Sequence, residues 1–242
     1  MNVLPIPYLS AGSAPVFPDP AQAMDAPNGL LALGGDLSVP RLLAAYGNGI
    51  FPWFGEDEPI LWWSPDPRCV FDTGAIHISR SLRRHLRRCD WELRIDTAFE
   101  QVLDACAAPR EGQHGTWIVP AMRQAYLELH QCGHAHSIEA WDGNTLVGGL
   151  YGVGVGRLFC GESMFSARSG GSKTVLVALC QRLHAAGCPW LDAQVTNPHL
   201  TSMGAIDIDR TRFLADVARL SVQSTPDGLW TPGALGKVRE RV

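Results

Sequence analysis

Residues 146–166, LVGGLYGVGVGRLFCGESMFS, contain two apolar stretches joined by a glycine-rich turn. Both stretches are typical of strands, and Gly154-Val155-Gly156 between them predicts the turn of a hairpin. A similar stretch precedes them, separated by a second turn sequence at Asp142-Gly143-Asn144. This part of the chain therefore predicts an antiparallel meander of three strands, at His136–Trp141, Leu146–Gly152 and Arg157–Met164.

The segments around the meander alternate between helix and strand. Apolar residues repeat at helical spacing from Ser172 to Ala186, where Gly187 ends the pattern, and a short apolar run at 189–195 predicts a buried strand. The same criteria predict four more helices, at Ser79–Arg88, Thr97–Cys106, Pro120–Cys132 and Asp209–Leu220. This order predicts an α+β fold with a mixed, largely antiparallel sheet packed by helices, and a substrate cleft where neighbouring strands part.

The first part of the chain differs in composition from the rest. Residues 1–66 are rich in Pro and Gly, contain one clear helical stretch at Pro40–Tyr46 and end in a cluster of aromatic residues. We expect a small loop-rich N-terminal domain at 1–66 and a larger domain at 67–242, which includes the basic helix at 79–88.

Composition narrows the class of protein. The chain has 242 residues, 46% of them apolar, and a net charge of −4, which argues against indiscriminate attraction to nucleic acid. No run approaches the roughly 20 apolar residues that cross a bilayer. The seven cysteines form no C-x-x-C pair and predict neither disulfides nor a zinc site. We expect a cytoplasmic protein without a membrane segment.

Polar residues interrupt two apolar runs where core residues are expected. Glu162 lies in FCGESMFS, and Asp192 and Gln194 lie in WLDAQV. Burying an unpaired carboxylate costs several kcal/mol or raises its pKa, so these acids indicate a functional site. Strand alternation places Glu162 and Met164 on one face, and Asp192 and Gln194 together on a face of the later strand.

A basic stripe and one aromatic loop indicate contacts with nucleic acid. Trp53 follows Pro52 in GIFPWF and is expected to contact a ligand, whereas Trp62 and Trp63 are expected to pack internally. Arginines at i, i+3, i+4, i+7 and i+8 share one helical stripe, which favours a phosphate-backbone site over a merely solvated face. These arginines are Arg80, Arg83, Arg84, Arg87 and Arg88.

Other common kinds of site lack their sequence signals. The loop SARSGGSKT has Ser172 and Ala167 where a nucleotide-binding P-loop needs glycine. His134 and His136 lack companion ligands, so no metal site is expected. There is no G-x-S-x-G elbow, which argues against a serine nucleophile. We expect no metal and no cofactor.

Several long blocks of the chain resemble one bacterial family, that of the leucyl/phenylalanyl-tRNA–protein transferases. The resemblance covers about residues 30–215. It is carried by GGDLSVPRLLAAYGNGIFPWF (34–54), LWWSPDPR (61–68), GTWIVPAMRQAYLELH (115–130), AHSIEAW (135–141), LVGGLYGVGVGRLFCGESMFS (146–166) and LDAQVTNPHLTSMGAIDIDRTRFL (191–214).

The resemblance implies a transferase with an N-acyltransferase-like C-terminal domain. It would move leucine or phenylalanine, and weakly methionine, from aminoacyl-tRNA to the N-terminal Arg or Lys of proteins, marking them for N-end rule degradation. By this resemblance the reaction centre holds Asp192 and Gln194, the acceptor site holds Glu162, and the acceptor stem of the tRNA binds Arg80, Arg83, Arg84 and Arg87. The aminoacyl pocket would be formed by Phe159, Met164, Leu176, Leu179 and Leu191, and the terminal adenosine and acceptor would lie at Trp53, Trp117 and Tyr126.

Two other functions fit parts of the pattern. A coenzyme A-dependent N-acetyltransferase shares the expected fold but requires a pyrophosphate-binding turn before the helix at 172–186, for which SARSGGSKT is a poor candidate. A non-catalytic tRNA-binding module would need the arginine stripe but would have no need for Asp192, Gln194 and Glu162.

Overall fold

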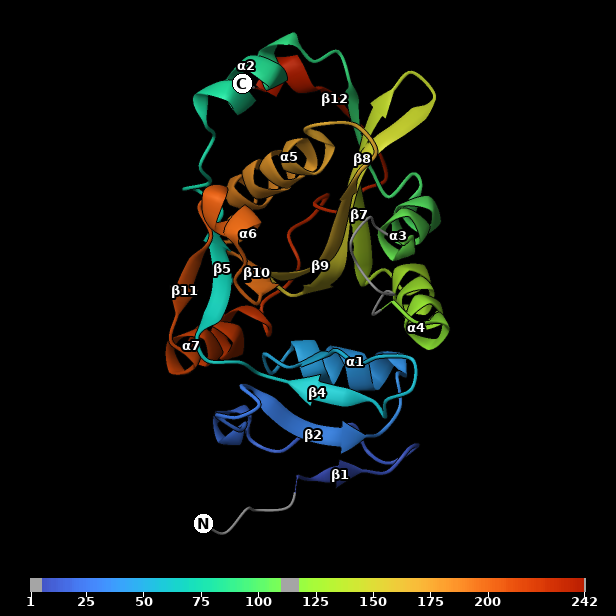
Figure 1. Ribbon diagram of the computed structural model, residues 1–242, viewed down its shortest axis with the longest axis vertical. Helices are drawn as coiled ribbons and strands as arrows, with labels where there is room; N and C mark the ends of the chain where they lie inside the picture. Colours follow the sequence, from blue (N-terminus) through green and yellow to red (C-terminus); the bar gives the residue numbers. More distant parts are fainter. Residues whose placement is uncertain (1–5, 110–117, 242) are drawn as a thin grey trace.

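Two sheets form the framework of the protein in the computed structural model, which describes residues 6–109 and 118–241. The smaller sheet has the strand order β1-β2-β4-β3 and lies at the N-terminal end of the molecule (Figure 1). Its strands are β1 (Tyr8–Leu9), β2 (Leu30–Gly34), β3 (Phe51–Pro52) and β4 (Leu61–Trp63).

The larger sheet carries the predicted meander at its centre. Its order is β11-β5-β10-β9-β8-β7-β6-β12, and every neighbouring pair is antiparallel except β9 and β10. Its strands are β5 (Arg68–Asp72), β6 (Glu92–Ile95), β7 (Ala135–Asp142), β8 (Thr145–Val155), β9 (Leu158–Ser166), β10 (Trp190–Gln194), β11 (Ile206–Ile208) and β12 (Gly233–Lys237).

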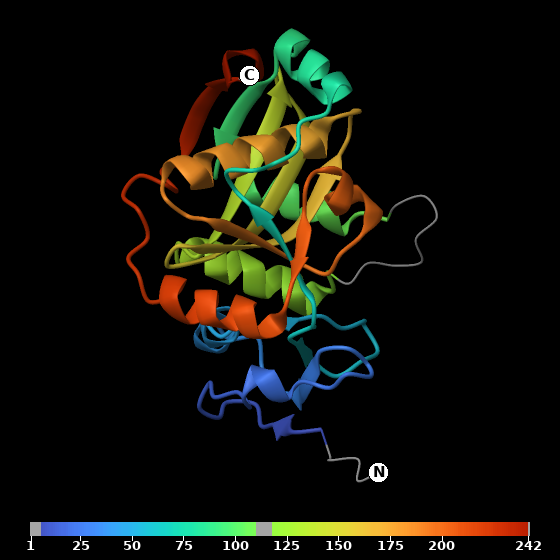
Figure 2. The same ribbon diagram turned by 90° about the vertical axis from the view of Figure 1, so that its left-hand side faces the viewer.

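Helices cover both faces of this sheet, as Figures 1 and 2 show. α5 (Gly171–Ala185) packs on one face, and α3 (Phe99–Ala107) and α4 (Pro120–Gln131) pack on the other. α1 (Val39–Tyr46) lies between the smaller sheet and the larger one. The remaining helices are α2 (Arg80–Arg88), α6 (Pro198–Ser202), α7 (Arg210–Leu220) and the 3-10 turns η1 (Pro20–Gln22) and η2 (Val238–Arg241).

The α+β class, the three meander strands and the long helices were predicted from the sequence, with ends that differ by up to three residues. The hairpin turn was misplaced: β8 continues through Val155, and the reversal occurs at Gly156, whose φ of +60° suits glycine. Short strands were missed where no periodic pattern is long enough to be read. They are the strands of the smaller sheet together with β5, β6, β11 and β12.

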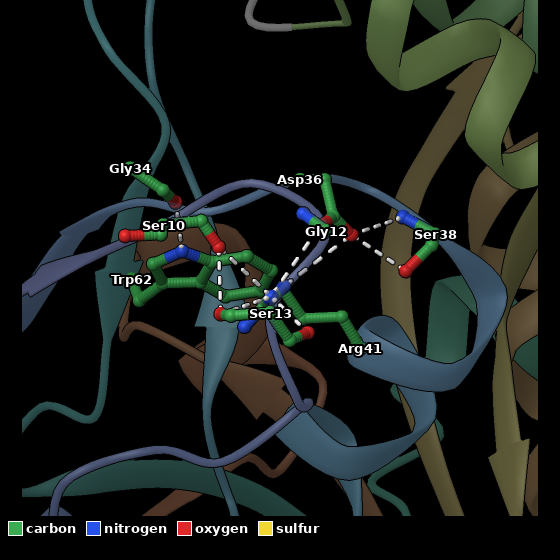
Figure 3. Close-up of polar contacts among 8 residues, drawn as sticks. All are labelled: Ser10, Gly12, Ser13, Gly34, Asp36, Ser38, Arg41 and Trp62. Carbon is green, nitrogen blue, oxygen red and sulfur yellow. Dashed lines mark hydrogen bonds and ion pairs between the residues drawn. The ribbon is translucent and has the colours of Figure 1, made fainter.

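A buried arginine ties the N-terminal segment to α1 (Figure 3). The Arg41 side chain is 1% exposed, and its Nη2 donates to the carbonyls of Ser10 and Ser13 at 3.3 and 3.0 Å. Its Nε lies 3.3 Å from the Asp36 carboxylate, which also accepts from the Gly12 amide. This cluster fixes residues 10–13 against α1, the helix that lies between the two sheets.

One hydrophobic core runs through both parts of the chain. The cluster that contains Trp62 of β4 and Tyr46 of α1 also contains Val102 of α3 and Tyr126 of α4. Trp62 is fully buried and its indole nitrogen donates to the Gly34 carbonyl at 2.8 Å, so it packs internally as expected. The smaller sheet is therefore held against the larger one by continuous apolar packing.

A buried carboxylate holds the start of α3. Glu139 of β7 is 0% exposed and accepts from the amides of Thr97 and Ala98, each at 3.1 Å, and from the Ser137 hydroxyl at 2.7 Å. These two amides lie just before the first residue of α3, so Glu139 satisfies donors where the chain enters the helix.

We predict that Glu139→Gln lowers the free energy of unfolding by about 1–3 kcal/mol, because an amide NH₂ replaces one accepting oxygen opposite buried donors. Urea unfolding monitored by circular dichroism measures this loss. The matched control is Glu100→Gln within α3, where the side chain is 65% exposed and pairs with Arg123. The control is expected to lose no more than about 1 kcal/mol. Equal losses in the two variants would contradict the prediction.

Candidate active site

A cavity of about 420 Å³ opens where β9 and β10 separate. The parallel pairing of these strands ends at Asp192 and Cys160, before Gln194 on one strand and Glu162 on the other. Gly161, Glu162 and Met164 of β9 face Ala193 and Gln194 of β10 across the opening. The cavity thus lies where the sequence analysis expected a cleft, and it has the size of a small-molecule site.

Glu162 is the acid that lines this cavity. Its Oε2 accepts from the Tyr126 hydroxyl at 2.5 Å and its Oε1 accepts from the Gln194 side-chain amide at 2.7 Å. Burial raises the pKa of Glu162 to about 7, although the hydrogen bonds from Tyr126 and Gln194 lower it. The carboxyl group therefore changes charge near neutral pH, and a cation bound beside it would favour the ionised form.

Asp192 lies beside this cavity but does not line it, because it is fully buried against Arg68. Arg68 Nε and Nη2 donate to the two Asp192 oxygens at 2.8 and 2.7 Å. The guanidinium group lies over the rings of Phe51 and Phe213, 4.8 and 4.5 Å from their centroids. Asp192 is thus one half of a bidentate, desolvated ion pair.

A bulge in β10 explains why simple alternation misplaced Asp192 and Gln194. The pairing with β5 skips Ala193, and Gln194 adopts a φ of +64°. The two side chains therefore do not share a face: the Gln194 amide lines the cavity, and the Asp192 carboxylate points into the core. The Gln194 backbone amide donates to Asp192 Oδ1 at 3.0 Å, so the ion pair holds the bulge in place.

These contacts form a closed ring that begins and ends in one turn of the N-terminal region. At one end, the Tyr46 hydroxyl lies 2.8 Å from the Tyr126 hydroxyl. At the other end, Arg68 Nη1 donates to the Gly49 carbonyl at 3.1 Å, and the Gly49 amide donates to the Tyr46 carbonyl at 3.1 Å. The end of α1 is therefore joined to both Glu162 and Asp192.

The apolar residues expected around the aminoacyl group fall into two sets. Met164, Leu176 and Leu191 line the cavity, together with Phe71 and Leu150, which the sequence analysis did not single out. Phe159 and Leu179 do not line it. They belong to the buried cluster that contains Leu176 and Leu191, and Phe159 packs against Trp230.

The three aromatic residues expected near the adenosine and acceptor also differ in position. Trp53 is 47% exposed and lines the cavity. Tyr126 is fully buried and contacts Glu162 with its hydroxyl, so it positions that acid and does not face the cavity. Trp117 lies outside the described residues.

The arginine stripe lies on α2, at the opposite end of the larger sheet from the N-terminal region (Figure 1). Ser79 caps the helix as predicted, accepting from the Leu82 amide at 3.2 Å, and Leu82 and Leu86 are buried beneath it. The five arginines are exposed, and no ion pair joins them to an acid within residues 6–109 and 118–241.

Two residues that organise the site were missed from the sequence, Arg68 and Tyr46. Arg68 follows two prolines and reads as part of a loop, and Tyr46 reads as an ordinary apolar position of an amphipathic helix. In the described parts of the chain, no group of three or more His, Cys, Asp or Glu side chains is arranged to hold a metal ion. No helix there is long and apolar enough to span a membrane.

We predict that Asp192→Asn lowers the free energy of unfolding by about 3–5 kcal/mol, because it leaves the Arg68 charge buried without its counterion. Arg68→Met is expected to lower the free energy of unfolding by a similar amount, because it leaves the Asp192 carboxylate buried without its counterion. The paired change Arg68→Met with Asp192→Asn removes both charges, so it should lose clearly less than the two single variants summed. Urea unfolding of the four proteins measures this cycle, and additive losses would contradict it.

Comparison with known proteins places the chain in one family. Residues 70–218 match the family described as leucyl/phenylalanyl-tRNA protein transferase, and residues 35–66 match the N-terminal domain of the same family. The leucyl/phenylalanyl-tRNA–protein transferase of Xanthomonas axonopodis pv. citri (strain 306) is 57% identical over 93% of this chain and 92% of its own length. That of Xylella fastidiosa (strain 9a5c) is 55% identical over 93% of both chains.

One solved structure gives a much weaker match. The structure of L-PGS from Bacillus licheniformis matches with a TM-score of 0.39 and 12% identity, covering 85% of this chain and 66% of that one. That likeness is too distant to bear on function. The sequence matches, which span nearly the whole of each relative, decide the assignment: this chain belongs to the leucyl/phenylalanyl-tRNA protein transferase family.

Proposed function

We propose that this protein transfers leucine or phenylalanine from aminoacyl-tRNA to the N-terminal Arg or Lys of an acceptor protein. The observation that carries the proposal is the cavity between β9 and β10, which joins an apolar lining to the hydrogen-bonded pair Glu162 and Gln194. Membership in the transferase family supplies the donor and acceptor classes.

The apolar lining suits the side chain of the donor. Met164, Leu176 and Leu191, with Phe71 and Leu150, offer a surface on which a γ-branched, aromatic or unbranched side chain gains free energy by burial. A β-branched side chain would crowd the ester carbonyl. Because one methylene group is worth only about 1–3 kcal/mol in such a pocket, methionine is a weaker third donor.

Glu162 suits the acceptor. A carboxylate offers about four lone-pair sites, and Tyr126 and Gln194 occupy two of them. The remaining sites accept from the guanidinium or ammonium group of an N-terminal Arg or Lys. The apolar surroundings strengthen that attraction relative to water.

The reaction requires alignment more than a strong base. The acceptor nitrogen attacks the ester carbonyl carbon, the bond to the ribose oxygen breaks, and the proton released by the amine passes to that oxygen. A free α-amino group has a pKa near 7.7–8, so a useful fraction is already neutral. We assign Gln194 to orienting this amine through its amide carbonyl, and Asp192 with Arg68 to holding Gln194 in place.

The tRNA would approach along two exposed features. The arginines of α2 meet its phosphates, and Trp53 on the rim of the cavity stacks against the terminal adenosine. A protein that receives leucine or phenylalanine in this way is directed to N-end rule degradation, and the reaction takes place in the cytoplasm.

The alternatives are less well supported. A coenzyme A-dependent N-acetyltransferase is not favoured by the family assignment, and the Ser172 amide at the start of α5 already donates to Ser166 Oγ at 2.8 Å. A tRNA-binding module without catalysis would have no need for the buried hydrogen bonds to Glu162.

The test is transfer of radiolabelled phenylalanine from its tRNA, without added cofactor, to peptides that begin with Arg or Ala. We expect transfer to the Arg peptide and little to the Ala peptide. Glu162→Gln removes the charge that selects the acceptor, so the preference for Arg should fall about tenfold or more, which corresponds to about 1.4 kcal/mol. An unchanged preference in Glu162→Gln would remove this residue from the acceptor site, and absence of transfer by the wild type would refute the function.

The arginine stripe has a separate test. Arg83→Glu with Arg84→Glu is expected to weaken tRNA binding and to reduce the slope of log K against log salt by about 0.7–0.9 for each phosphate that is no longer neutralised. Filter binding across a salt series measures both quantities. The control is Arg212→Glu with Arg219→Glu on α7, which changes the net charge equally at exposed positions away from α2. Equal slopes in the two double variants would show that α2 is a solvated face.

A further inference from the structure

We propose that Tyr46 is a positioning residue for the transfer reaction, because its hydroxyl donates to Tyr126 and thereby keeps Glu162 in the ionised form that receives a cationic acceptor. The inference rests on the proposed function and adds a residue from the N-terminal region to its site. It is carried by the geometry of the hydrogen-bond chain from α1 through α4 to β9.

The direction of these hydrogen bonds follows from the number of protons that each tyrosine hydroxyl can donate. A tyrosine hydroxyl has one proton to donate and two lone pairs to accept with. Tyr126 uses its proton on Glu162 Oε2 at 2.5 Å. In the 2.8 Å contact between the two hydroxyls, Tyr46 is therefore the donor and Tyr126 the acceptor. A hydroxyl that accepts one hydrogen bond donates a stronger one, so Tyr46 strengthens the bond that stabilises the carboxylate.

Protonation of Glu162 would disrupt these hydrogen bonds. The Gln194 amide donates to Oε1, so an added proton belongs on Oε2, where it points at the Tyr126 hydroxyl. Tyr126 must then turn its own proton toward Tyr46, and Tyr46 must turn away. Both hydroxyls are fully buried, where a donor without an acceptor costs about 1–3 kcal/mol. The hydrogen-bond chain from Tyr46 through Tyr126 therefore favours the charged form of Glu162.

Other groups face Glu162 from the surrounding strands without forming this chain. Asp192 raises the pKa of Glu162, and the Arg68 charge is taken up by its pairing with Asp192. Tyr151 of β8 and Cys160 of β9 are buried nearby, and the pKa of each is raised by its own burial and by Glu162. Of the titratable groups in these surroundings, Tyr126 donates to Glu162 directly, and Tyr46 is the one whose hydroxyl contacts that donor.

Tyr151 offers a matched control. It is fully buried, its ring packs edge-on against Tyr126 with centroids 5.2 Å apart, and its hydroxyl has no hydrogen-bond partner in the described parts of the chain. Tyr151→Phe therefore deletes the same atom from the same core as Tyr46→Phe, but it breaks no link to Glu162.

The experiment compares kcat/KM for an Arg peptide between pH 5.5 and 9 in the wild type, Tyr46→Phe and Tyr151→Phe, with saturating phenylalanyl-tRNA. We expect the acidic limb of Tyr46→Phe to move up by about 0.5–1 pH unit, a three- to tenfold loss at pH 6 that disappears at high pH. Tyr151→Phe should follow the wild type. The amine of the peptide titrates identically in all three enzymes, so the difference between profiles reports the enzyme. Tyr126→Phe should shift the limb further in the same direction.

Coincident profiles for Tyr46→Phe and the wild type, or equal shifts in Tyr46→Phe and Tyr151→Phe, would overturn the inference. A second readout does not depend on activity: titration of the protonated-carboxyl infrared band that Glu162→Gln abolishes. This band should titrate at higher pH in Tyr46→Phe than in the wild type, and an unchanged midpoint counts against the role of Tyr46. If the wild type transfers nothing, the proposed function fails, while the infrared midpoint still decides whether Tyr46 sets the charge of Glu162.

Discussion

The buried ion pair between Arg68 and Asp192 constrains the rest of the site. Removing both charges from water costs several kcal/mol each, and the pair offsets this cost only if its geometry is good and the remaining donors and acceptors are satisfied. The structure meets that condition, because the contact is bidentate and the spare groups bind the Gly49 carbonyl and the Gln194 amide. A displacement of β10, β5 or the turn after α1 would leave a buried charge without a partner.

This constraint gives the two acids of the site different roles. Asp192 forms a bidentate pair with Arg68 inside the core and accepts from the Gln194 backbone amide, so it serves to position neighbouring groups. Glu162 has no such partner and is held by neutral donors, which leaves its pKa near 7 and its remaining lone pairs open to the cavity. The two carboxylates thus differ in what they can bind, because Asp192 is paired with Arg68 and Glu162 keeps lone pairs open to the cavity.

The sequence could predict those parts of the structure that depend on periodic patterns. The helices and meander strands have such patterns over at least one and a half turns or five residues. Glu162 was found because a charge in an apolar strand is conspicuous. The ion pair was not found: Arg68 and Asp192 are 124 positions apart, and a bulge at Ala193 breaks the alternation that would have placed Asp192. Nothing in the local sequence around Tyr46 distinguishes a core tyrosine from one whose hydroxyl reaches a functional acid.

The ring of contacts also explains how a small N-terminal sheet is joined to the candidate active site. Tyr46 and Gly49 lie three residues apart, and the chain then continues directly to Phe51 and Trp53 at the cavity. One short turn therefore sets the hydrogen bonds behind Glu162, the ion pair behind Gln194 and the aromatic rim of the cavity. Because these three features share one backbone segment, a movement of that segment cannot alter the rim without also altering the partners of both acids. The N-terminal region is thus coupled to the candidate active site by covalent continuity as well as by packing.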